Sequence, residues 1–368
     1  MSTELDYWHY FATGYVAARE RFREAASRAE AEQTTHAHPT ARGPGGEVLS
    51  IDVARIGAAS APRQLLAISG THGLEGAAGS AVQVAWLATA ARQLPAGVAV
   101  TLIHGLNPYG FAHATRTTEN NVDLNRNFVD HDAPYPGNAD YAELHERLIP
   151  GQWDRDALAD AVLATEAFRD RHGADALFNV LASGQYTHPE GLVYGGSGRE
   201  WSNRVLQQIV DAQLAQAERV GFIDWHTGIG DYAEPFFLCF NEEGSALQRE
   251  AARWWGGDRI LRQRPHGLAR PNYQGLVFNG VERFLGGRPM VGAVVEFGTR
   301  GPNTSLSTRL DQWLRFKAPL APDAQRDALL RDDLRDAFVP YSAVWRRSVV
   351  RHGLQITAQA LDGLAGWQ

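Results

Sequence analysis

A histidine and a glutamate lie three residues apart in the segment Ser69-Gly70-Thr71-His72-Gly73-Leu74-Glu75-Gly76. The segment directly follows residues 64–68, an apolar run that predicts a buried strand, so both side chains are expected on a loop at the strand's end. A histidine nitrogen and a glutamate oxygen are ligands that zinc accepts. Alone this pair is a weak signal, and its interpretation depends on three later segments.

The third ligand candidate is His226, at the end of the apolar run 220–225 and before a glycine-rich turn. A catalytic zinc site needs three protein ligands and an open position for water. A capping or core role is the usual alternative for an isolated histidine. The position of His226 at a strand end, with His72 and Glu75 upstream, favours the ligand role.

Glu296 ends another apolar run, residues 291–295. A carboxylate in that place is costly unless it faces a polar site. Hydrolysis at a zinc site also needs a base that takes the proton from water, and Glu296 is the candidate. The alternative is an ion pair between Glu296 and Arg300 at the strand exit.

The fourth segment begins at Asn107-Pro108-Tyr109-Gly110-Phe111 and runs through Arg116 to Asn121-Val122-Asp123-Leu124-Asn125-Arg126-Asn127-Phe128. Arginine and asparagine bind a carboxylate through charge-assisted hydrogen bonds. An arginine beside a metal can also stabilise a developing oxyanion. The alternative is a turn rich in Asn and Asp with solvated arginines. The specific order of residues from Asp123 to Phe128 makes this alternative the less favoured one.

The elements that must position these residues alternate between strands and helices. This order predicts an α/β fold with a mostly parallel sheet covered by helices on both faces, in which sites gather at the carboxyl ends of strands. We expect one domain over residues 1–368. A helix at about 3–31, with Thr3 as its N-cap, and a helical segment at about 309–345 should pack on it. Residues 129–155 and 184–198 are expected to be long loops.

Composition excludes several classes of protein. The 368 residues are 44% hydrophobic, the net charge is −7, and there is no basic stripe for nucleic acid. The single cysteine, Cys239, cannot form an intrachain disulfide. No stretch reaches the roughly 20 apolar residues of a membrane span, and no signal peptide is visible, so a cytoplasmic location is expected. The aromatic face of residues 3–31 can pack on its own core or on a partner subunit, which leaves a homo-oligomer open.

Taken together, the motifs resemble those of the zinc carboxypeptidase family. They are His-x-x-Glu, Asn-Pro-x-Gly, Asp-x-Asn-Arg-Asn-Phe, a later strand-end His and a final strand-end Glu. The Asp-Leu-Asn-Arg form also resembles the aspartoacylase and succinylglutamate desuccinylase deacylases. Gly-Thr-His-Gly-x-Glu-Gly, Asn-Pro-Tyr-Gly-Phe-Ala-His, Gln-Tyr-x-His-Pro-x-Gly-Leu, Trp-Ser-Asn and Asp-x-His-Thr-Gly-x-Gly are similar to a bacterial branch called DUF2817.

The resemblance implies a three-layer α/β/α zinc carboxypeptidase-like (phosphorylase/hydrolase-like) fold with a mixed, twisted sheet. It also implies one Zn²⁺ per chain. It implies a role for each matching residue, as follows: His72, Glu75 and His226 as zinc ligands, Glu296 as general base, Arg116 as the oxyanion-stabilising arginine, Asn125 and Arg126 as the pair that binds the substrate's carboxylate, and Asp123 as the carboxylate that orients His72.

The chain departs from the family pattern at the mobile tyrosine that lies about twenty residues before the general base. Tyr273 is near that place at an insecure offset, and Tyr232 is a rival. His188, in the 184–198 loop, is a further candidate for substrate contact, with stabilisation of the loop as the alternative. The missing secretion signal makes extracellular protein digestion doubtful.

The sequence therefore predicts a zinc hydrolase that cleaves an amide bond next to a free carboxylate, on a small peptide or an N-acyl amino acid. The carboxylate-binding pair does not separate a carboxypeptidase from an amino-acid deacylase. Segments 129–155 and 184–200 suggest a restricted entrance and a small substrate. A non-catalytic binding protein of the same fold should have lost a ligand or the base. A serine hydrolase is disfavoured because the chain has no nucleophile elbow.

Overall fold

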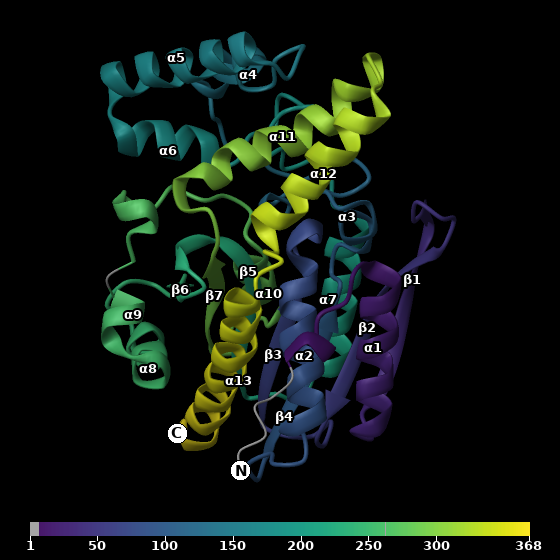
Figure 1. The fold of residues 1–368 in the computed structure, drawn as a ribbon. Coiled ribbons are helices and arrows are strands. Elements are labelled where there is room, and N and C mark those ends of the chain that lie inside the picture. The colour runs from purple at the N-terminus through teal and green to yellow at the C-terminus, as the bar shows by residue number, and fades with distance from the viewer. Residues whose placement is uncertain (1–6, 262) are drawn as a thin grey trace.

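The structure is a computed structural model that describes residues 7–261 and 263–368. Its centre is a seven-stranded sheet in the order β1–β2–β4–β3–β5–β7–β6 (Figure 1). The strands are β1 (Glu32–Arg42), β2 (Val48–Ile56), β3 (Arg63–Ser69), β4 (Val98–His104), β5 (Arg219–Tyr232), β6 (Pro235–Leu238) and β7 (Met290–Gly298). The helices are α1 (Tyr15–Arg28), α2 (Gly76–Thr89), α3 (Pro108–His113), α4 (Tyr141–Leu148), α5 (Arg155–His172), α6 (Ala174–Ala182), α7 (Trp201–Gln213), α8 (Ala246–Trp255), α9 (Gly257–Leu261), α10 (Val277–Phe284), α11 (Thr304–Phe316), α12 (Ala324–Phe338) and α13 (Ala343–Gly366).

The sheet is parallel at its centre and antiparallel at its edges. Strands β4, β3, β5 and β7 run parallel, whereas β1, β2 and β6 pair antiparallel with their neighbours. β4 and β7 are buried along their whole length and β3 and β5 over most of theirs, because these strands are largely continuous apolar runs that helices cover on both faces. The predicted α/β class with a mixed, mostly parallel sheet is confirmed.

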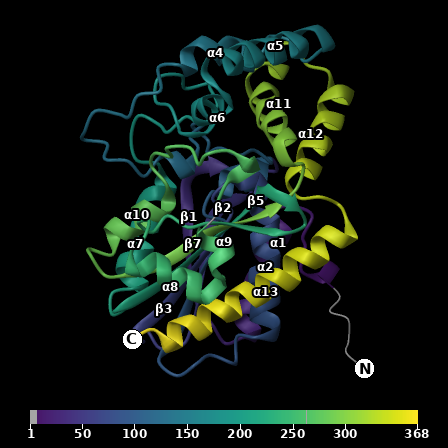
Figure 2. The same ribbon diagram turned by 90° about the vertical axis from the view of Figure 1, so that its left-hand side faces the viewer.

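Two apolar cores, one on each face of the sheet, make the three layers. On β3, Leu65 and Ala67 point into a core covered by α1, α2, α8 and α13. The alternating Leu66 and Ile68 point into a core covered by α7 and α10. Helices α4, α5, α6, α11 and α12 lie together beyond one end of the sheet (Figure 2). No helix in the described ranges has both the length and the apolar character that a bilayer span requires.

The N-terminal prediction of one helix over 3–31 is wrong. A short 3₁₀ turn at Tyr7–His9 is followed by an extended Gly14, and α1 begins only at Tyr15. The predicted cap, Thr3, lies outside the described residues. The aromatic face covers this chain's own core, where Tyr15 and Phe22 are buried.

Two further segments hold more helix than predicted. The C-terminal helical segment does not end at 345, because the 24-residue helix α13 continues to Gly366. The segment 129–155 contains α4, whose Tyr141, Leu144 and Leu148 are buried against α5 and α6. In both places an apolar stripe at helical spacing is present, and the surrounding Pro, Gly and Asp residues masked it in 129–155.

Candidate active site

Three neighbouring parallel strands carry the predicted metal ligands and base to one edge of the sheet. The chain leaves β3 through Gly70, whose φ of +72° and close approach to Gly105 favour glycine. It then forms a 3₁₀ turn, Gly73–Glu75, that follows His72. His226 on β5 is the register neighbour of Glu296 on β7. Because β3, β5 and β7 are adjacent and parallel, their carboxyl ends bring these side chains together.

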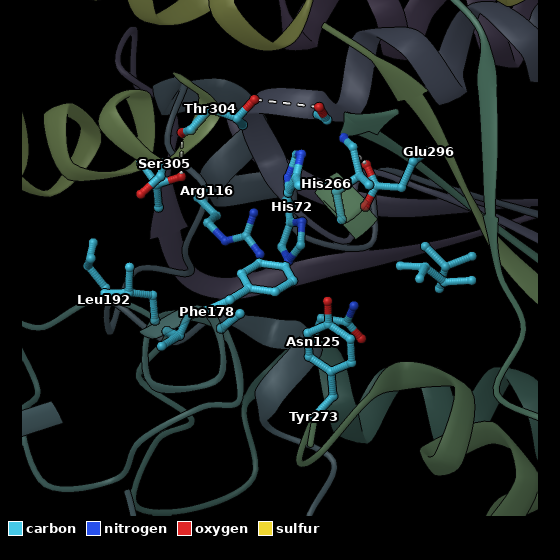
Figure 3. Close-up of a pocket in the computed structure, with 18 of the residues that line it drawn as sticks. His72, Arg116, Asn125, Phe178, Leu192, His266, Tyr273, Glu296, Thr304 and Ser305 are labelled. Atoms are coloured by element: carbon cyan, nitrogen blue, oxygen red, sulfur yellow. Dashed lines mark hydrogen bonds between the residues drawn. The ribbon is translucent and has the colours of Figure 1, made fainter. Parts of the chain in front are cut away.

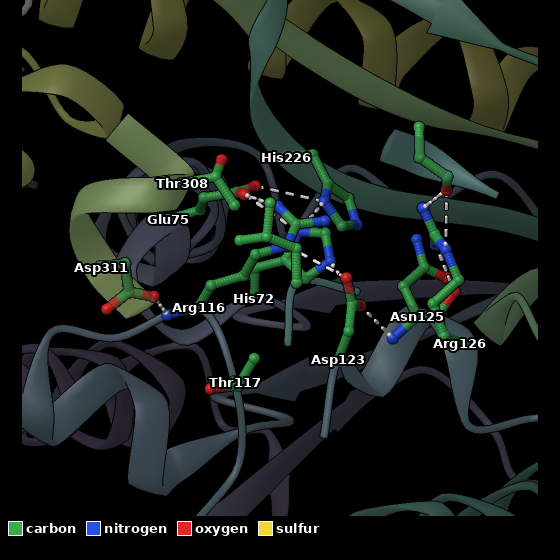
Figure 4. Close-up of polar contacts among 12 residues, drawn as sticks. His72, Glu75, Arg116, Thr117, Asp123, Asn125, Arg126, His226, Thr308 and Asp311 are labelled. Carbon is green, nitrogen blue, oxygen red and sulfur yellow. Dashed lines mark hydrogen bonds and ion pairs between the residues drawn. The ribbon is translucent and has the colours of Figure 1, made fainter. Parts of the chain in front are cut away.

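The side chains of His72, Glu75 and His226 form the one potential metal-binding cluster among the described residues. Nδ1 of His72 lies 2.9 Å from Oε1 of Glu75, and Nδ1 of His226 lies 3.2 Å from Oε2 of the same carboxylate. The two Nδ1 atoms are 3.1 Å apart (Figure 4). All three side chains are buried, so little of the cluster's surface is exposed to solvent.

Each histidine presents its other nitrogen to a buried aspartate. Nε2 of His72 donates to Oδ1 of Asp123 at 3.1 Å, and Nε2 of His226 lies 3.0 Å from Oδ2 of Asp224. The hydroxyl of Thr71 donates to both oxygens of Asp224, at 2.9 and 3.0 Å. A carboxylate at Nε2 favours the tautomer that carries the proton there, which leaves the Nδ1 lone pair for the cluster.

This arrangement requires positive charge at its centre. Two Nδ1 lone pairs and a carboxylate that face one another repel unless a proton or a metal ion lies between them. Burial lowers the pKa of His226, but Asp224 and Glu75 outweigh burial and hold it well above its usual value. Two imidazole nitrogens and a carboxylate oxygen are a donor set that suits Zn²⁺, and the residues present fit that ion.

Arg116 lies beside the cluster because helix α3 sets its loop. Asn107 caps α3 by accepting from Gly110 N at 2.9 Å, and Ala114 ends the helix in the left-handed conformation. The Arg116 guanidinium then donates to Asp123 Oδ2 at 3.1 Å and to Glu75 Oε1 at 3.3 Å. Its backbone N–H donates to Asp311 of α11 at 2.8 Å. The arginine is thus held from both ends and faces the metal-binding cluster.

Glu296 is a buried carboxylate whose pKa lies near neutral pH. Burial raises its pKa to about 7, although the neighbouring His226 opposes this effect. One carboxylate oxygen accepts from Ile229 N at 3.4 Å. The side chain lines the same cavity as Glu75. Figure 3 shows Glu296 and His72 at this cavity.

Asn125 and Arg126 stand on a 3₁₀ turn, Leu124–Arg126, that Asp123 caps. Asn125 Oδ1 accepts from Val277 N at 2.8 Å, so its amide NH₂ group remains for another partner. Arg126 donates to Ala182 O from Nε and Nη2, at 3.0 and 2.6 Å, and to Asn125 O from Nη1 at 2.5 Å. No carboxylate among the described residues pairs with this buried guanidinium. It is therefore suited to an anionic group from outside the chain.

A cavity of about 470 Å³ joins these groups. Its walls include His72, Glu75, Arg116, Asn125, Arg126, Tyr273 and Glu296. Tyr273 packs against Arg126, whose guanidinium carbon lies 5.0 Å from the centre of the ring. His226 and Asp123 lie behind this wall, in contact with His72. The structure thus brings together nine of the sequence-predicted site residues.

Tyr232 and His188 lie elsewhere. Tyr232 is half-exposed at the end of β5 and is not among the residues that line the cavity. His188 packs against the rings of Tyr141 and His145, with centroids 5.5 and 4.4 Å away. Of the two long segments expected at the entrance, 184–200 contributes Leu192 and Val193 to the cavity, and 129–155 contributes no lining residue.

Sequence reasoning missed Asp224, Asp311 and helix α6. Asp224 precedes His226 by two residues on β5, so alternation along the strand places both side chains on one face. That spacing was a usable signal, since a carboxylate inside an apolar strand is costly without a partner. Asp311 gave no comparable signal, because its partners Thr115 and Arg116 are nearly two hundred residues away.

Comparison with solved structures shows the fold. Bovine thrombin-activatable fibrinolysis inhibitor, solved with a tick carboxypeptidase inhibitor, matches 97% of this chain and 98% of its own with a TM-score of 0.53 and 10% identity. A metallo-carboxypeptidase from Burkholderia cenocepacia matches 94% of this chain and 68% of its own (TM-score 0.43, 13% identity). A succinylglutamate desuccinylase from Silicibacter sp. matches 83% and 65% (TM-score 0.38, 16% identity).

The match to the bovine protein agrees with the zinc carboxypeptidase-like fold that the motifs predicted. No curated protein matches the sequence. The model of one family, described as protein of unknown function (DUF2817), matches residues 11–352, which is nearly the whole chain. The chain therefore belongs to the DUF2817 family.

Proposed function

We propose that this protein is a zinc-dependent hydrolase that cleaves an amide bond next to a free carboxylate. The observation that carries the proposal is one cavity with two chemically distinct ends. At one end lie a buried metal-binding cluster and a carboxylate base, and at the other lies Arg126, which forms no ion pair with a carboxylate in the described part of the chain. The first suits the attack of water on a carbonyl, and the second suits a substrate's terminal carboxylate.

The zinc ligands, Glu296 and Arg116 have different roles in the proposed reaction. A zinc ion bound by His72, Glu75 and His226 would supply a Lewis acid and would lower the pKa of a water molecule. Glu296 accepts the proton of the attacking water and then donates it to the leaving nitrogen. The Arg116 guanidinium stabilises the negative charge that develops on the carbonyl oxygen.

Asn125 and Arg126 orient the substrate. Three of the five N–H groups of Arg126 donate to backbone oxygens, which leaves two for a carboxylate. The amide NH₂ group of Asn125 is available beside them. When these two residues hold the substrate's carboxylate, the amide bond lies in a fixed position relative to Glu296. Binding energy is thereby used to orient the reacting groups.

Two substrate classes fit this chemistry. The first is a short peptide cleaved as a carboxypeptidase does, and the second is a small N-acyl amino acid cleaved as a deacylase does. The cavity of about 470 Å³ suits either, because it holds a ligand of modest size. A binding protein without catalysis is the remaining alternative. The presence of all three ligands and of Glu296 makes it the weaker one.

The test is a screen of short peptides and N-acyl amino acids with zinc-loaded protein, with release of free amine as the readout. The matched blank is Glu296→Gln, which keeps the size of the side chain and removes the base. Cleavage by the wild type alone, with zinc bound to both proteins, supports the proposal. Unchanged turnover by Glu296→Gln with zinc bound would show that the mechanism is wrong.

A further inference from the structure

One wall of the cavity is an apolar helix that the chemistry described so far does not use. Helix α6 contributes Ala174, Leu177, Phe178 and Leu181, which recur at the i, i+3, i+4 and i+7 spacing of a single helical face. Only Val180 of this helix is buried. This side of α6 lines the cavity, and Leu177 and Leu181 also pack in part against the core between α4 and α5, whereas Phe178 is not part of that core. Phe178 and Leu192 are visible on the same side in Figure 3.

The helix is tied to the carboxylate-binding end of the cavity. Its last residue, Ala182, accepts both the Nε and the Nη2 hydrogen bonds of Arg126. Along the helix, the apolar face therefore starts at Leu181 beside Arg126 and leads away from it through Phe178 and Leu177. A ligand whose carboxylate contacts Arg126 has this face within reach of the rest of its structure.

The charges of the cavity indicate one carboxylate and not two. Arg116 is already paired with Asp123 and Glu75, and Arg169 is half-exposed with Glu166 and Asp170 each 3.8 Å away. Among the arginines that line the cavity, this leaves Arg126 as the one without a carboxylate partner in the described residues. A second carboxylate placed against α6 would contact leucine and phenylalanine side chains, where its desolvation is not compensated.

We propose that the substrate is an amide with a single carboxylate and an apolar group, and that the apolar face of α6 binds this group. The inference rests on the proposed hydrolase function and specifies its substrate class. The apolar group can belong to the acyl half or to the amino-acid half of the amide, and both would present the same hydrocarbon surface to Leu177, Phe178 and Leu181. Burial of this hydrocarbon surface contributes binding energy without hydrogen bonds, and it favours substrates whose apolar group is larger.

The experiment measures kcat/KM for two substrate series with zinc-loaded protein. One series varies the acyl chain of an N-acyl alanine from two to eight carbons, and the other varies the amino acid of N-acetyl substrates from alanine to leucine and phenylalanine. In at least one series we expect kcat/KM to rise about fourfold per added methylene. N-succinyl amino acids and N-acetyl-glutamate, which carry a second carboxylate, should have lower kcat/KM than apolar substrates of equal length.

Variants locate the effect on the helix. Phe178→Ala and Leu177→Ala should each lower kcat/KM for the largest apolar substrates by about tenfold and leave N-acetyl-alanine within about twofold. Leu163→Ala, on α5 and 61% exposed outside the cavity, is the matched control and should change neither series. Two results would overturn the inference. One is a wild-type kcat/KM that does not change with the size of the apolar group in either series, and the other is an equal loss of kcat/KM by Phe178→Ala on every substrate.

Calorimetric binding of carboxylates that cannot be hydrolysed separates this inference from the hydrolase proposal. 4-Phenylbutanoate should bind more tightly than acetate or succinate, and Phe178→Ala should remove the difference. If this holds while no amide is cleaved, the hydrolase proposal fails and the assignment of α6 stands. If amides are cleaved without dependence on α6, the hydrolase proposal stands and the assignment of α6 fails.

Discussion

Nδ1 of His226 lies 3.1 Å from Nδ1 of His72, and buried aspartates contact the opposite nitrogens of both rings. Two imidazoles so arranged cannot both be neutral at low energetic cost without a cation between them. The stability of the cluster therefore depends on the proton or metal ion that supplies this positive charge. The four predictions below concern the metal, Asp224, the base Glu296 and the position of Arg126.

The first concerns the metal itself. Purified protein should contain about one zinc per chain, since three protein ligands converge. Removal of zinc by a chelator should lower the melting temperature, because a ligand that binds only the folded state stabilises it. Elemental analysis and thermal unfolding measure both quantities. His226→Ala should lose the metal, whereas His188→Ala should retain it, because His188 lies outside the cavity.

The second concerns Asp224. Asp224→Asn keeps the shape of the side chain and removes the charge that orients His226, so zinc affinity should fall about 10–100-fold. Competition with a chromogenic chelator measures the affinity. Thr71→Ala, which removes the hydroxyl that donates to Asp224, should have the smaller effect. An Asp224→Asn variant with wild-type zinc affinity would mean that the charge of Asp224 does not strengthen metal binding by His226.

The third concerns pH. Glu296 must be ionised to accept a proton, so kcat/KM should fall as the pH drops through its pKa. Burial raises that pKa to about 7 in the protein without metal, and a bound cation shifts it downward, so the acidic limb should lie at or below about 7. Glu296→Gln should lower kcat by about a hundredfold to ten-thousandfold and abolish this limb. An acidic limb that survives in the residual activity of Glu296→Gln would assign it to another group.

The fourth concerns Gly184, which follows α6 with φ of +113°. A Cβ at this position would lie 2.9 Å from Cδ of Arg126. Gly184→Ala should therefore displace the guanidinium and raise KM by about ten- to a hundredfold, with less effect on kcat. Gly244→Ala is the control, since Gly244 also has positive φ (+73°) but nothing within 4 Å. If both variants raise KM equally, backbone strain and not the contact with Arg126 is the cause.

The residues that could be predicted from the sequence are those with a strong local signal. His72, Glu75, His226 and Glu296 could be found because each stands at the end of a continuous apolar run, and such runs predict buried parallel strands. The sheet's centre was predictable for the same reason.

Other elements lacked such a signal. Strand β1 is polar and mostly exposed, because it is an edge strand held by backbone pairing with β2, so no apolar alternation marks it. The start of α1 at Tyr15 was missed because the residues before it also carry aromatic side chains at roughly helical spacing. Helix α6 is apolar, and its apolar face lines the cavity. Hydrophobic periodicity alone does not distinguish a helix that lines a cavity from one that packs on a core. Tyr273 and Tyr232 could not be separated before the chain was folded, since their distances from Arg126 depend on tertiary packing.

The pairing of His226 with Glu296 across β5 and β7 has a consequence for how such a protein can change. Neighbouring strands are spaced about 4.8 Å apart by their hydrogen bonds, so the sheet itself fixes the separation of the proposed ligand and base. Helix α6 and the loop that contains Leu192 belong to other parts of the chain. Substitutions there can alter what the cavity accepts without moving the reacting groups, which makes this scaffold a practical starting point for redesigning specificity.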